Sequence, residues 1–342
     1  MAVVIGWDIG GAHLKAARAE NGRIVATVQV ASPLRLGLER LTQSFDEAKA
    51  QMGLADRHAI TMTGELADTF ASRTEGVVSL TEVALRALSP LPVALYAGRA
   101  GFVSPDKAAM HIIDIASANW FASASFAGKP MRSALFMDMG STTTDIIPVI
   151  GGVVASRGYT DGERLASGEL VYTGLVRSFL MATESRAPFA GQWTSLVHEN
   201  FANMADVQRI LGTLPDDADQ MMTADGRPKT VAASRARFAR MVGRDAEDAD
   251  NVAWEALARW FAEAQVRAVT DGAMLVLSQG RLPPEAPIVA AGVGAGVLRE
   301  VARRLERGCI AFDSVLDVAA EARAGASSCA PAAAVAMLGS LL

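Results

Sequence analysis

The chain has 342 residues, about the length of two ordinary domains. Hydrophobic residues make up 51% and charged residues 20% of it, which predicts a large buried core and excludes disorder as the main state. The 32 basic and 37 acidic residues give a net charge of −5, which argues against nucleic acid or an anionic membrane as the main partner. Two cysteines and four histidines supply neither a disulfide scaffold nor, alone, a zinc site, so we expect a reducing, cytoplasmic location.

Both ends of the sequence are apolar without resembling membrane signals. The start, MAVVIGWDIGG, has no basic residue and is interrupted by Asp8, so it predicts a buried strand and not a signal peptide. Residues 324–342 carry no charged side chain, but they are mostly alanine, serine, glycine and proline. This composition predicts a closely packed, buried helix in a soluble protein and not a membrane anchor.

The first third of the chain alternates predicted strands and helices. Residues 3–31 read as three strands joined by tight turns at Gly10-Gly11 and Asn21-Gly22, the second of which is a strong hairpin signal. Helical spacing follows over 38–52, then a strand at 58–65, a helix within 77–88 and a strand within 92–103. Residues 112–126 again have helical spacing.

The opening pattern recurs in the second half. The segment ALFMDMGSTTTDIIPVIGGVVASRG is again strand, glycine turn and strand, and Asp138 and Gly140 follow Asp8 and Gly10 at a distance of 130 residues. An aspartate two residues before a glycine turn, on an otherwise apolar strand, occurs in both copies. We therefore favour a duplicated domain over a coincidence of two similar turns.

The remaining sequence contains an insertion and a final α/β unit. Residues from about 186 to 250 are polar and predict an inserted subdomain of short helices. A long amphipathic helix is expected over 252–277, with a core-facing stripe of Trp254, Leu257, Phe261 and Ala264. A strand–helix–strand unit follows it.

Three glycine turns predict phosphate binding. Glycine lets backbone N–H groups approach an anion closely, hydroxyl side chains add donors, and the third turn opens a helix, whose N-terminus attracts anions. Lys15 is a further candidate, with a surface position as its alternative. The candidate phosphate-binding residues are Gly10, Gly11, Lys15, Gly140, Ser141, Thr142, Thr143, Thr144, Gly292, Gly294 and Gly296.

Asp8 and Asp138 are the candidate metal ligands. A carboxylate that ends an apolar strand is costly to bury without a partner. Mg²⁺, held largely through water beside phosphate oxygens, would be such a partner. The alternative is that each aspartate caps its own turn.

Taken alone, the third turn also resembles a dinucleotide-binding fingerprint. It follows a strand and opens a helix, and Asp313 ends the next strand 21 residues after Gly292. However, Val297 stands where the last glycine of that fingerprint belongs, and the two earlier turns would be left unexplained.

All three turns in this order resemble the superfamily of acetate kinase, sugar kinases, Hsp70 and actin. Within it the chain looks closest to the hydantoinase A/oxoprolinase branch. The stretches IGWDIGGAHLKAA, TMTGELAD, SANW, MDMGSTTTDIIP and TDGERLASGELVYTG resemble tetrahydromethanopterin-linked one-carbon-transfer proteins and their relatives in methanofuran biosynthesis. The resemblance implies two duplicated actin-like (ribonuclease H-like) α/β domains, residues 1–130 and 131–342, that face a cleft, with the helical insertion in the second.

The resemblance also implies a reaction. In the narrower group, the phenol of γ-glutamyltyramine or a tyrosine analogue displaces diphosphate from an aminomethylfuran-methyl diphosphate and forms an ether. Such a transferase would need Mg²⁺, whereas the use of ATP stays open. The alternatives are an ATP-dependent hydrolase or kinase of the same fold and a non-catalytic nucleotide sensor.

Further residues become candidates under this reaction. The phenol needs a base, for which Glu65, Asp161 and Glu169 are the candidates, with helix capping or an interdomain ion pair as the alternative for each. Asn119, Trp120 and Asp225 are candidates for substrate contact, against core and surface-turn alternatives. We expect small-molecule substrates and no nucleic-acid or membrane partner, and leave a homodimer open.

Overall fold

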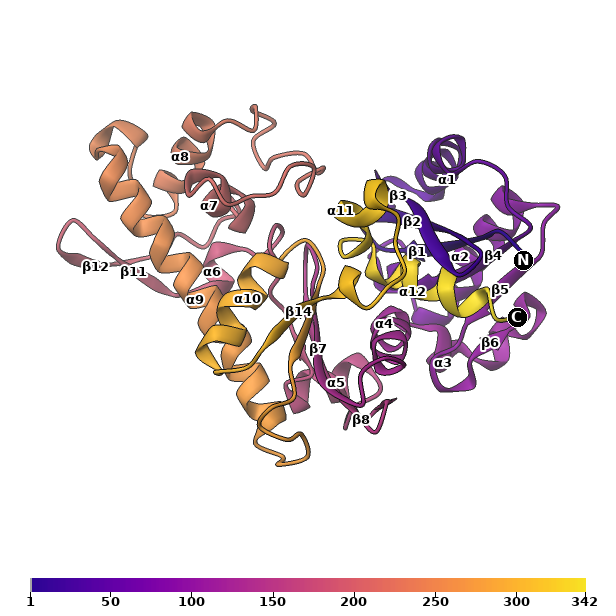
Figure 1. The fold of residues 1–342 in the computed structure, drawn as a ribbon. Coiled ribbons are helices and arrows are strands. Elements are labelled where there is room, and N and C mark those ends of the chain that lie inside the picture. Colours follow the sequence, from indigo (N-terminus) through magenta and orange to yellow (C-terminus); the bar gives the residue numbers. More distant parts are fainter. Residues whose placement is uncertain (1) are drawn as a thin grey trace.

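The computed structural model describes residues 2–342 and contains two main sheets (Figure 1). In the first sheet, β1, β2 and β3 are antiparallel neighbours, whereas β4 and β5 continue parallel to β1. Asn21 and Gly22, both with positive φ, form the expected turn between β2 and β3. The strand order is β3 (Arg23–Ala31), β2 (His13–Glu20), β1 (Val4–Ile9), β4 (Arg57–Met62), β5 (Val93–Tyr96) and β6 (Phe102–Val103).

The second sheet repeats this arrangement. Its central strand β7 is antiparallel to β8 and parallel to β13, which in turn is parallel to β14. The order is β10 (Leu170–Val171), β8 (Thr144–Ile150), β7 (Ser133–Met139), β13 (Ile288–Ala291) and β14 (Cys309–Ala311), with β9 (Val153–Val154) paired to β8. Asp8 and Asp138 are each the last residue but one of the corresponding strand. The predicted duplicated α/β fold is confirmed.

Helices cover the outer face of each sheet. Ile5, Trp7 and Ile9 of β1 pack against α1 (Leu38–Met52) and α2 (Arg73–Leu88). In the second sheet, Leu135 and Met137 pack against α9 (Asn251–Leu277) and α10 (Ala295–Arg304). Because side chains alternate along a strand, the even-numbered residues of β1 and β7, including both aspartates, face the other way.

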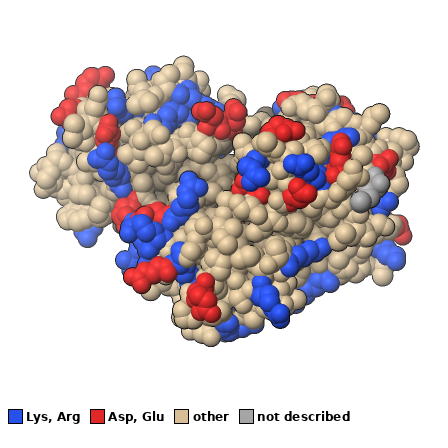
Figure 2. All heavy atoms as spheres, in the orientation of Figure 1, with Lys and Arg blue, Asp and Glu red and all other residues tan. Residues whose placement is uncertain are grey.

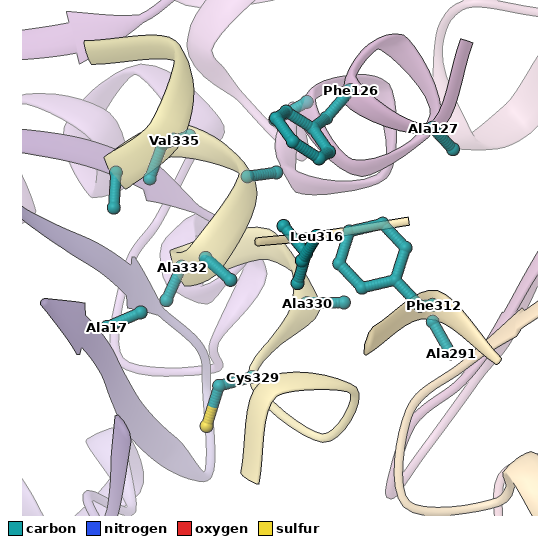
Figure 3. Close-up of a cluster of buried hydrophobic side chains, with 14 of the residues drawn as sticks. Ala17, Phe126, Ala127, Ala291, Phe312, Leu316, Cys329, Ala330, Ala332 and Val335 are labelled. Atoms are coloured by element: carbon teal, nitrogen blue, oxygen red, sulfur yellow. The ribbon is translucent and has the colours of Figure 1, made fainter. Parts of the chain in front are cut away.

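The space between the sheets holds a shared core. It contains α4 (Asn119–Gly128) and α12 (Ala330–Gly339), and Figure 3 shows residues from both helices beside Ala17, Ala291 and Phe312. A Cβ at Gly6 would lie 2.1 Å from the carbonyl oxygen of Ala332, so β1 and α12 are in backbone contact. The predicted buried C-terminal helix is confirmed, and its alanines allow this close approach.

The position of α12 in space differs from the domain to which the sequence assigns it. Although the sequence assigns residues 131–342 to the second domain, α12 returns to the first sheet, where it packs on β1, β2 and β4. The short helix α11 (Arg323–Ala326) contacts β3, and α3 (Ile112–Ile115) contacts α2. The division near residue 130 stays a prediction, and the C-terminal helix is an exception to it in space.

The insertion is not entirely helical. The short helix α6 (Leu180–Thr183) precedes it. The insertion contains α7 (Met204–Ile210) and α8 (Val231–Arg240), but it begins with a hairpin of β11 (Arg186–Phe189) and β12 (Gln192–Ser195). Its own core is closed by Trp254, Leu257 and Phe261 of α9, the stripe that the sequence predicted. Figure 1 shows the insertion, with α7, α8, β11 and β12, at the upper left, beside the second sheet's helix α9.

The surface carries both signs of charge. Figure 2 shows basic and acidic side chains interspersed over one face of the molecule. Within residues 2–342, no helix combines the length and the apolar character needed to cross a membrane.

Candidate active site

Asp8 and Asp138 lie at the ends of the two central strands and face the shared interior. Their exposed fractions are 4% and 9%. Burial raises the pKa of Asp8 to about 6 and that of Asp138 to about 7, because a charged carboxylate is disfavoured away from water. The charge of Asp8 also raises the pKa of Asp138, so the two carboxyl groups are electrostatic neighbours.

Lys15 lies beside both aspartates. It is paired with Asp8 in the β1–β2 register, and its Nζ donates to the carbonyl oxygen of Ser328 at 2.8 Å. Its positive charge lowers the pKa of both Asp8 and Asp138, although burial outweighs this effect. Lys15 is therefore half-buried in the site and not a free surface lysine.

The first two glycine turns have the same geometry. The N–H of Gly10 donates to the oxygen of His13, and the N–H of Gly140 donates to that of Thr143, at 3.0 and 2.9 Å. Among residues 2–342, the N–H groups of Gly11, Thr142 and Thr143 meet no acceptor, and the buried Ser141 Oγ has no partner. These donors are available to an anion.

Thr144 differs from the other hydroxyl residues of the second turn. Its Oγ1 is buried and donates to the carbonyl oxygen of Thr173 at 2.7 Å. This hydroxyl is already used within the protein, so Thr144 holds the turn in place and does not offer a donor to a phosphate.

The first two glycines of the third turn are closely packed against neighbouring residues. A Cβ at Gly292 would lie 2.3 Å from Asp138 Oδ1, and one at Gly294 would lie 2.4 Å from the side chain of Met139. The N–H of Gly292 donates to Ser327 and that of Gly294 to Met139. The absence of a side chain at these two positions lets the turn pack closely against Asp138 and Met139. Their N–H groups are already hydrogen-bonded, contrary to the expectation that they are free for phosphate. Gly296, in the first turn of α10, has no such contact.

Two of the three candidate bases lie together. Ser117 Oγ lies 2.8 Å from Glu65 Oε1 and 3.1 Å from Asp161 Oδ2. Glu65 follows β4, is fully buried, and leaves Oε2 without a partner. Burial, with a smaller contribution from the neighbouring Asp161, raises the pKa of Glu65 to about 7. Since Ser117 has one hydroxyl proton, it can donate to only one carboxylate at a time.

Asp161 connects Glu65 and Ser117 to the second domain. Its carboxylate accepts from Arg73 of α2 at 2.9 Å and from Arg164 at 3.0 Å. Asp161 begins α5 (Asp161–Ser167), and the buried Arg164 also pairs with Asp145 of β8 at 2.5 Å. Asp161 is thus a fully paired carboxylate in an interdomain ion pair, which leaves Glu65 as the better base.

Glu169 does not lie in an environment suited to a base. Its two oxygens accept from the N–H groups of Arg157 and Gly158, at 2.6 and 2.7 Å, and from Ser167 Oγ at 2.8 Å. These three donors occupy both carboxylate oxygens and leave no position for a substrate proton. The geometry assigns Glu169 to holding the chain before α5.

The three candidate substrate residues are not grouped around the aspartates. Trp120 is buried, and the Arg164 guanidinium lies 4.4 Å from the centre of its ring. Asn119 Oδ1 accepts from the N–H of Trp120 at 2.7 Å at the start of α4. Asp225, in the insertion, accepts from Arg237 at 3.2 Å and from the N–H of Arg227. Trp120 thus packs against Arg164, Asn119 bonds the backbone at the start of α4, and Asp225 stabilises its own turn.

Three residues of the site were not singled out from the sequence. Ser117, Arg164 and Asp145 join the candidate base to the second sheet, and they lie in the stretches SANW, TDGERLASGELVYTG and MDMGSTTTDIIP, respectively. Arg177 is a further addition, since its guanidinium donates to Thr142 Oγ1 at 3.4 Å. Burial, with smaller contributions from the charges of Lys15 and Arg177, lowers the pKa of His13 to about 3, so this ring is neutral.

The aspartate pair fits a Mg²⁺ ion whose other ligands are mostly waters and phosphate oxygens. Asp8 Oδ1 is buried and has no hydrogen-bond partner, as expected of an atom that awaits a cation. Residues 2–342 contain no cluster of three or more histidine, cysteine or acidic side chains arranged for a metal. Mg²⁺ suits such a site because it commonly binds through one or two carboxylates, with waters and phosphate oxygens completing an octahedron.

Comparisons with known proteins place the chain in a family. A family model described as hydantoinase/oxoprolinase matches residues 56–338. The chain belongs to this family. It is also 31% identical over 248 residues, 72% of this chain and 73% of the other, to a curated protein of Methanocaldococcus jannaschii. That protein is named (4-{4-[2-(gamma-L-glutamylamino)ethyl]phenoxymethyl}furan-2-yl)methanamine synthase.

Further matches agree with this placement. A Methanococcus vannielii protein of the same name is 33% identical over 129 residues, 36% of this chain and 58% of that protein. The relatives are synthases, and the resemblance to the methanofuran-biosynthesis group is confirmed.

Two solved structures share the fold. A nucleotide-free acetone carboxylase has a TM-score of 0.59 and 10% identity over 98% of this chain and 70% of that one. A ROK-family glucokinase from Streptomyces griseus, solved with glucose and AMPPNP, has a TM-score of 0.50 and 16% identity over 98% of both chains. At these identities the likeness shows the fold alone.

Proposed function

We propose that the protein is a cytoplasmic transferase of methanofuran biosynthesis that joins an aminomethylfuran-methyl diphosphate to γ-glutamyltyramine or its tyrosine analogue. An ether forms and diphosphate is released. The observation that carries the proposal is the buried Asp8–Asp138 pair between two turns with free N–H donors, in a chain related to synthases of such a phenoxymethyl-furan product.

The two turns supply the environment that a diphosphate leaving group needs. The free N–H groups of Gly11, Thr142 and Thr143 and the hydroxyl of Ser141 would hold its oxygens, and Lys15 adds a positive charge. Asp8 and Asp138 would hold Mg²⁺, which neutralises the charge that develops on the departing diphosphate. Ionised aspartates alone would repel it.

Glu65 is the proposed general base. The phenol proton passes to the free oxygen Oε2, the phenolic oxygen forms a bond to the furan-methyl carbon, and the bond from that carbon to the diphosphate oxygen breaks with its electron pair. A pKa of about 7 suits this role, because such a base is partly ionised at neutral pH yet still accepts a proton. Ser117, donating to Oε1, would fix the orientation of the carboxyl group.

The test is an assay of purified protein with both substrates and Mg²⁺, with and without ATP, read by mass spectrometry. We expect the ether product at the same rate in both samples, because diphosphate is already the activated leaving group. Product that requires ATP would instead support an ATP-dependent enzyme of the same fold. Absence of product with every phenolic acceptor would contradict the transferase.

A further inference from the structure

A cavity of about 340 Å³ lies beside the second glycine turn, at the β10 edge of the second sheet. It is bounded by the turn itself, by the chain after β10, and by α6 and α9. Its volume is in the range of small-molecule sites. Its lining includes Thr142, Tyr172, Arg177 and Phe179.

Two aromatic side chains of this cavity are unusually exposed. The exposed fraction is 71% for Tyr172 and 46% for Phe179, although the adjoining Thr173, Leu175 and Leu180 are buried. Aromatic rings exposed within a cavity offer flat apolar faces to a ligand ring. They also offer negative π-faces to a positive charge.

Arg177 lies where the cavity meets the phosphate turns. Its guanidinium bonds Thr142 Oγ1 of the second turn, and its charge acts on His13 of the first turn. The N–H of Arg177 donates to the oxygen of Ser141 at 2.8 Å, which fixes this residue to the turn. An anion held by the second turn would thus have a guanidinium on the side from which the cavity opens.

We propose that this cavity binds the ring of an arylmethyl diphosphate, with the diphosphate on the second turn and Arg177 and the ring against Tyr172 and Phe179. The inference rests on the proposed function and assigns the donor substrate to one side of the site. In this arrangement the aromatic rings also stabilise the transition state. Positive charge develops on the methyl carbon as the bond to diphosphate breaks, and the negative π-faces stabilise that charge.

The third glycine turn is separated from this cavity within the second sheet. This turn, another candidate anion site from the sequence, follows β13, and both β7 and β8 separate β13 from β10. The candidate base Glu65 is linked through Ser117, Asp161 and Arg164 to Asp145 of β8, next to β10. The contacts that begin at Glu65 thus end on the strand beside the cavity edge.

The test measures binding and does not depend on turnover. With Mg²⁺ present, the probes are methylenediphosphonate and its furan-2-ylmethyl ester, which the enzyme cannot cleave, titrated calorimetrically. We expect the wild-type protein to bind the ester about tenfold more tightly than the parent. Tyr172→Ala and Phe179→Ala should each remove most of that preference and leave the affinity for the parent unchanged.

Trp193→Ala is the matched control, because Trp193 is an aromatic residue with a 56% exposed fraction on the β11–β12 hairpin, outside the cavity. It should leave both affinities unchanged. A wild-type ring preference that survives in both cavity variants would overturn the assignment. The two proposals can fail separately. If the ring preference depends on Tyr172 and Phe179 but the protein makes no ether, the cavity assignment is sustained and the proposed function fails.

Discussion

Glu65 and Glu169 show how environment separates two buried glutamates. Glu65 has one unpaired oxygen and a pKa raised to about 7 by burial, whereas both oxygens of Glu169 accept backbone N–H groups. The sequence places both in similar polar, glycine-containing segments. It could not distinguish them, because the partners of Glu65 come from residues 117 and 161, far along the chain.

We predict that Glu65→Gln lowers kcat about 100-fold or more with little change in KM, the usual effect of removing a general base. In the wild type, activity should fall as the pH drops through about 7, because the base becomes protonated. Steady-state rates from pH 5 to 9 check this. The variant should lose that inflection, and an unchanged profile would contradict the role. Glu169→Gln, as a matched control, should destabilise the fold and keep the inflection.

The two aspartates make stability depend on pH in the direction opposite to that of an ordinary salt-bridged carboxylate. Their folded-state pKa values, about 6 and 7, lie above the unfolded value near 4. The folded protein therefore binds protons more tightly, and stability is lost as the pH rises from about 4 to about 7. The loss is about 1.4 kcal/mol for each unit of pKa difference.

We expect Asp138→Asn to flatten this pH dependence. Urea unfolding at pH 4.5, 6 and 7.5, without divalent ions, measures it. The wild type should become less stable across the series, with a smaller loss in Asp138→Asn, since the uncharged amide has no proton to release. Parallel curves for the two proteins would show that Asp138 ionises as freely in the folded state as in the unfolded one.

At the scale of elements, the contact of β1 with α12 depends on one glycine. A Cβ at Gly6 would overlap the backbone of α12 at Ala332 and Ala336, which cannot move without separating helix and sheet. We predict that Gly6→Ala lowers the free energy of unfolding by about 1–3 kcal/mol or more, as overpacking in a closely packed core does. Chemical denaturation measures this.

Gly162→Ala is the control for this change. Gly162 lies in α5, and a Cβ there meets nothing within 4 Å. Alanine is the better helix former, so this variant should be as stable as the wild type or more stable. Equal stability of Gly6→Ala and Gly162→Ala would contradict the close packing of β1 on α12.

Elements with strong local signals were predictable, and those fixed by distant contacts were not. The Asn21-Gly22 turn and the Asp-x-Gly repeat carry their own signals. The β11–β12 hairpin was missed because four-residue strands show too little alternation, although its turn at Ala190-Gly191 has positive φ. Gly292 and Gly294 were assigned to phosphate because a glycine pattern does not distinguish close packing from ligand contact.

At the scale of the whole molecule, the site exists because two sheets share one interior. The core around α4 and α12 joins them, and the Arg73–Asp161 and Arg164–Asp145 ion pairs connect the first sheet's helices to β8. The repeat in the sequence predicted two similar halves. It could not predict the return of the C-terminal helix to the first sheet, because alanine-rich helices pack equally well on either sheet.

The central claim is that one aspartate from each half holds the same Mg²⁺-diphosphate. The most direct measurement is calorimetric titration of inorganic diphosphate with Mg²⁺ into the wild type, Asp8→Asn, Asp138→Asn and the double variant. We predict that each single variant loses affinity about tenfold or more, and that the double variant loses little beyond that, because both side chains serve one ion. Undiminished binding in either single variant, or losses that add independently, would contradict the shared site.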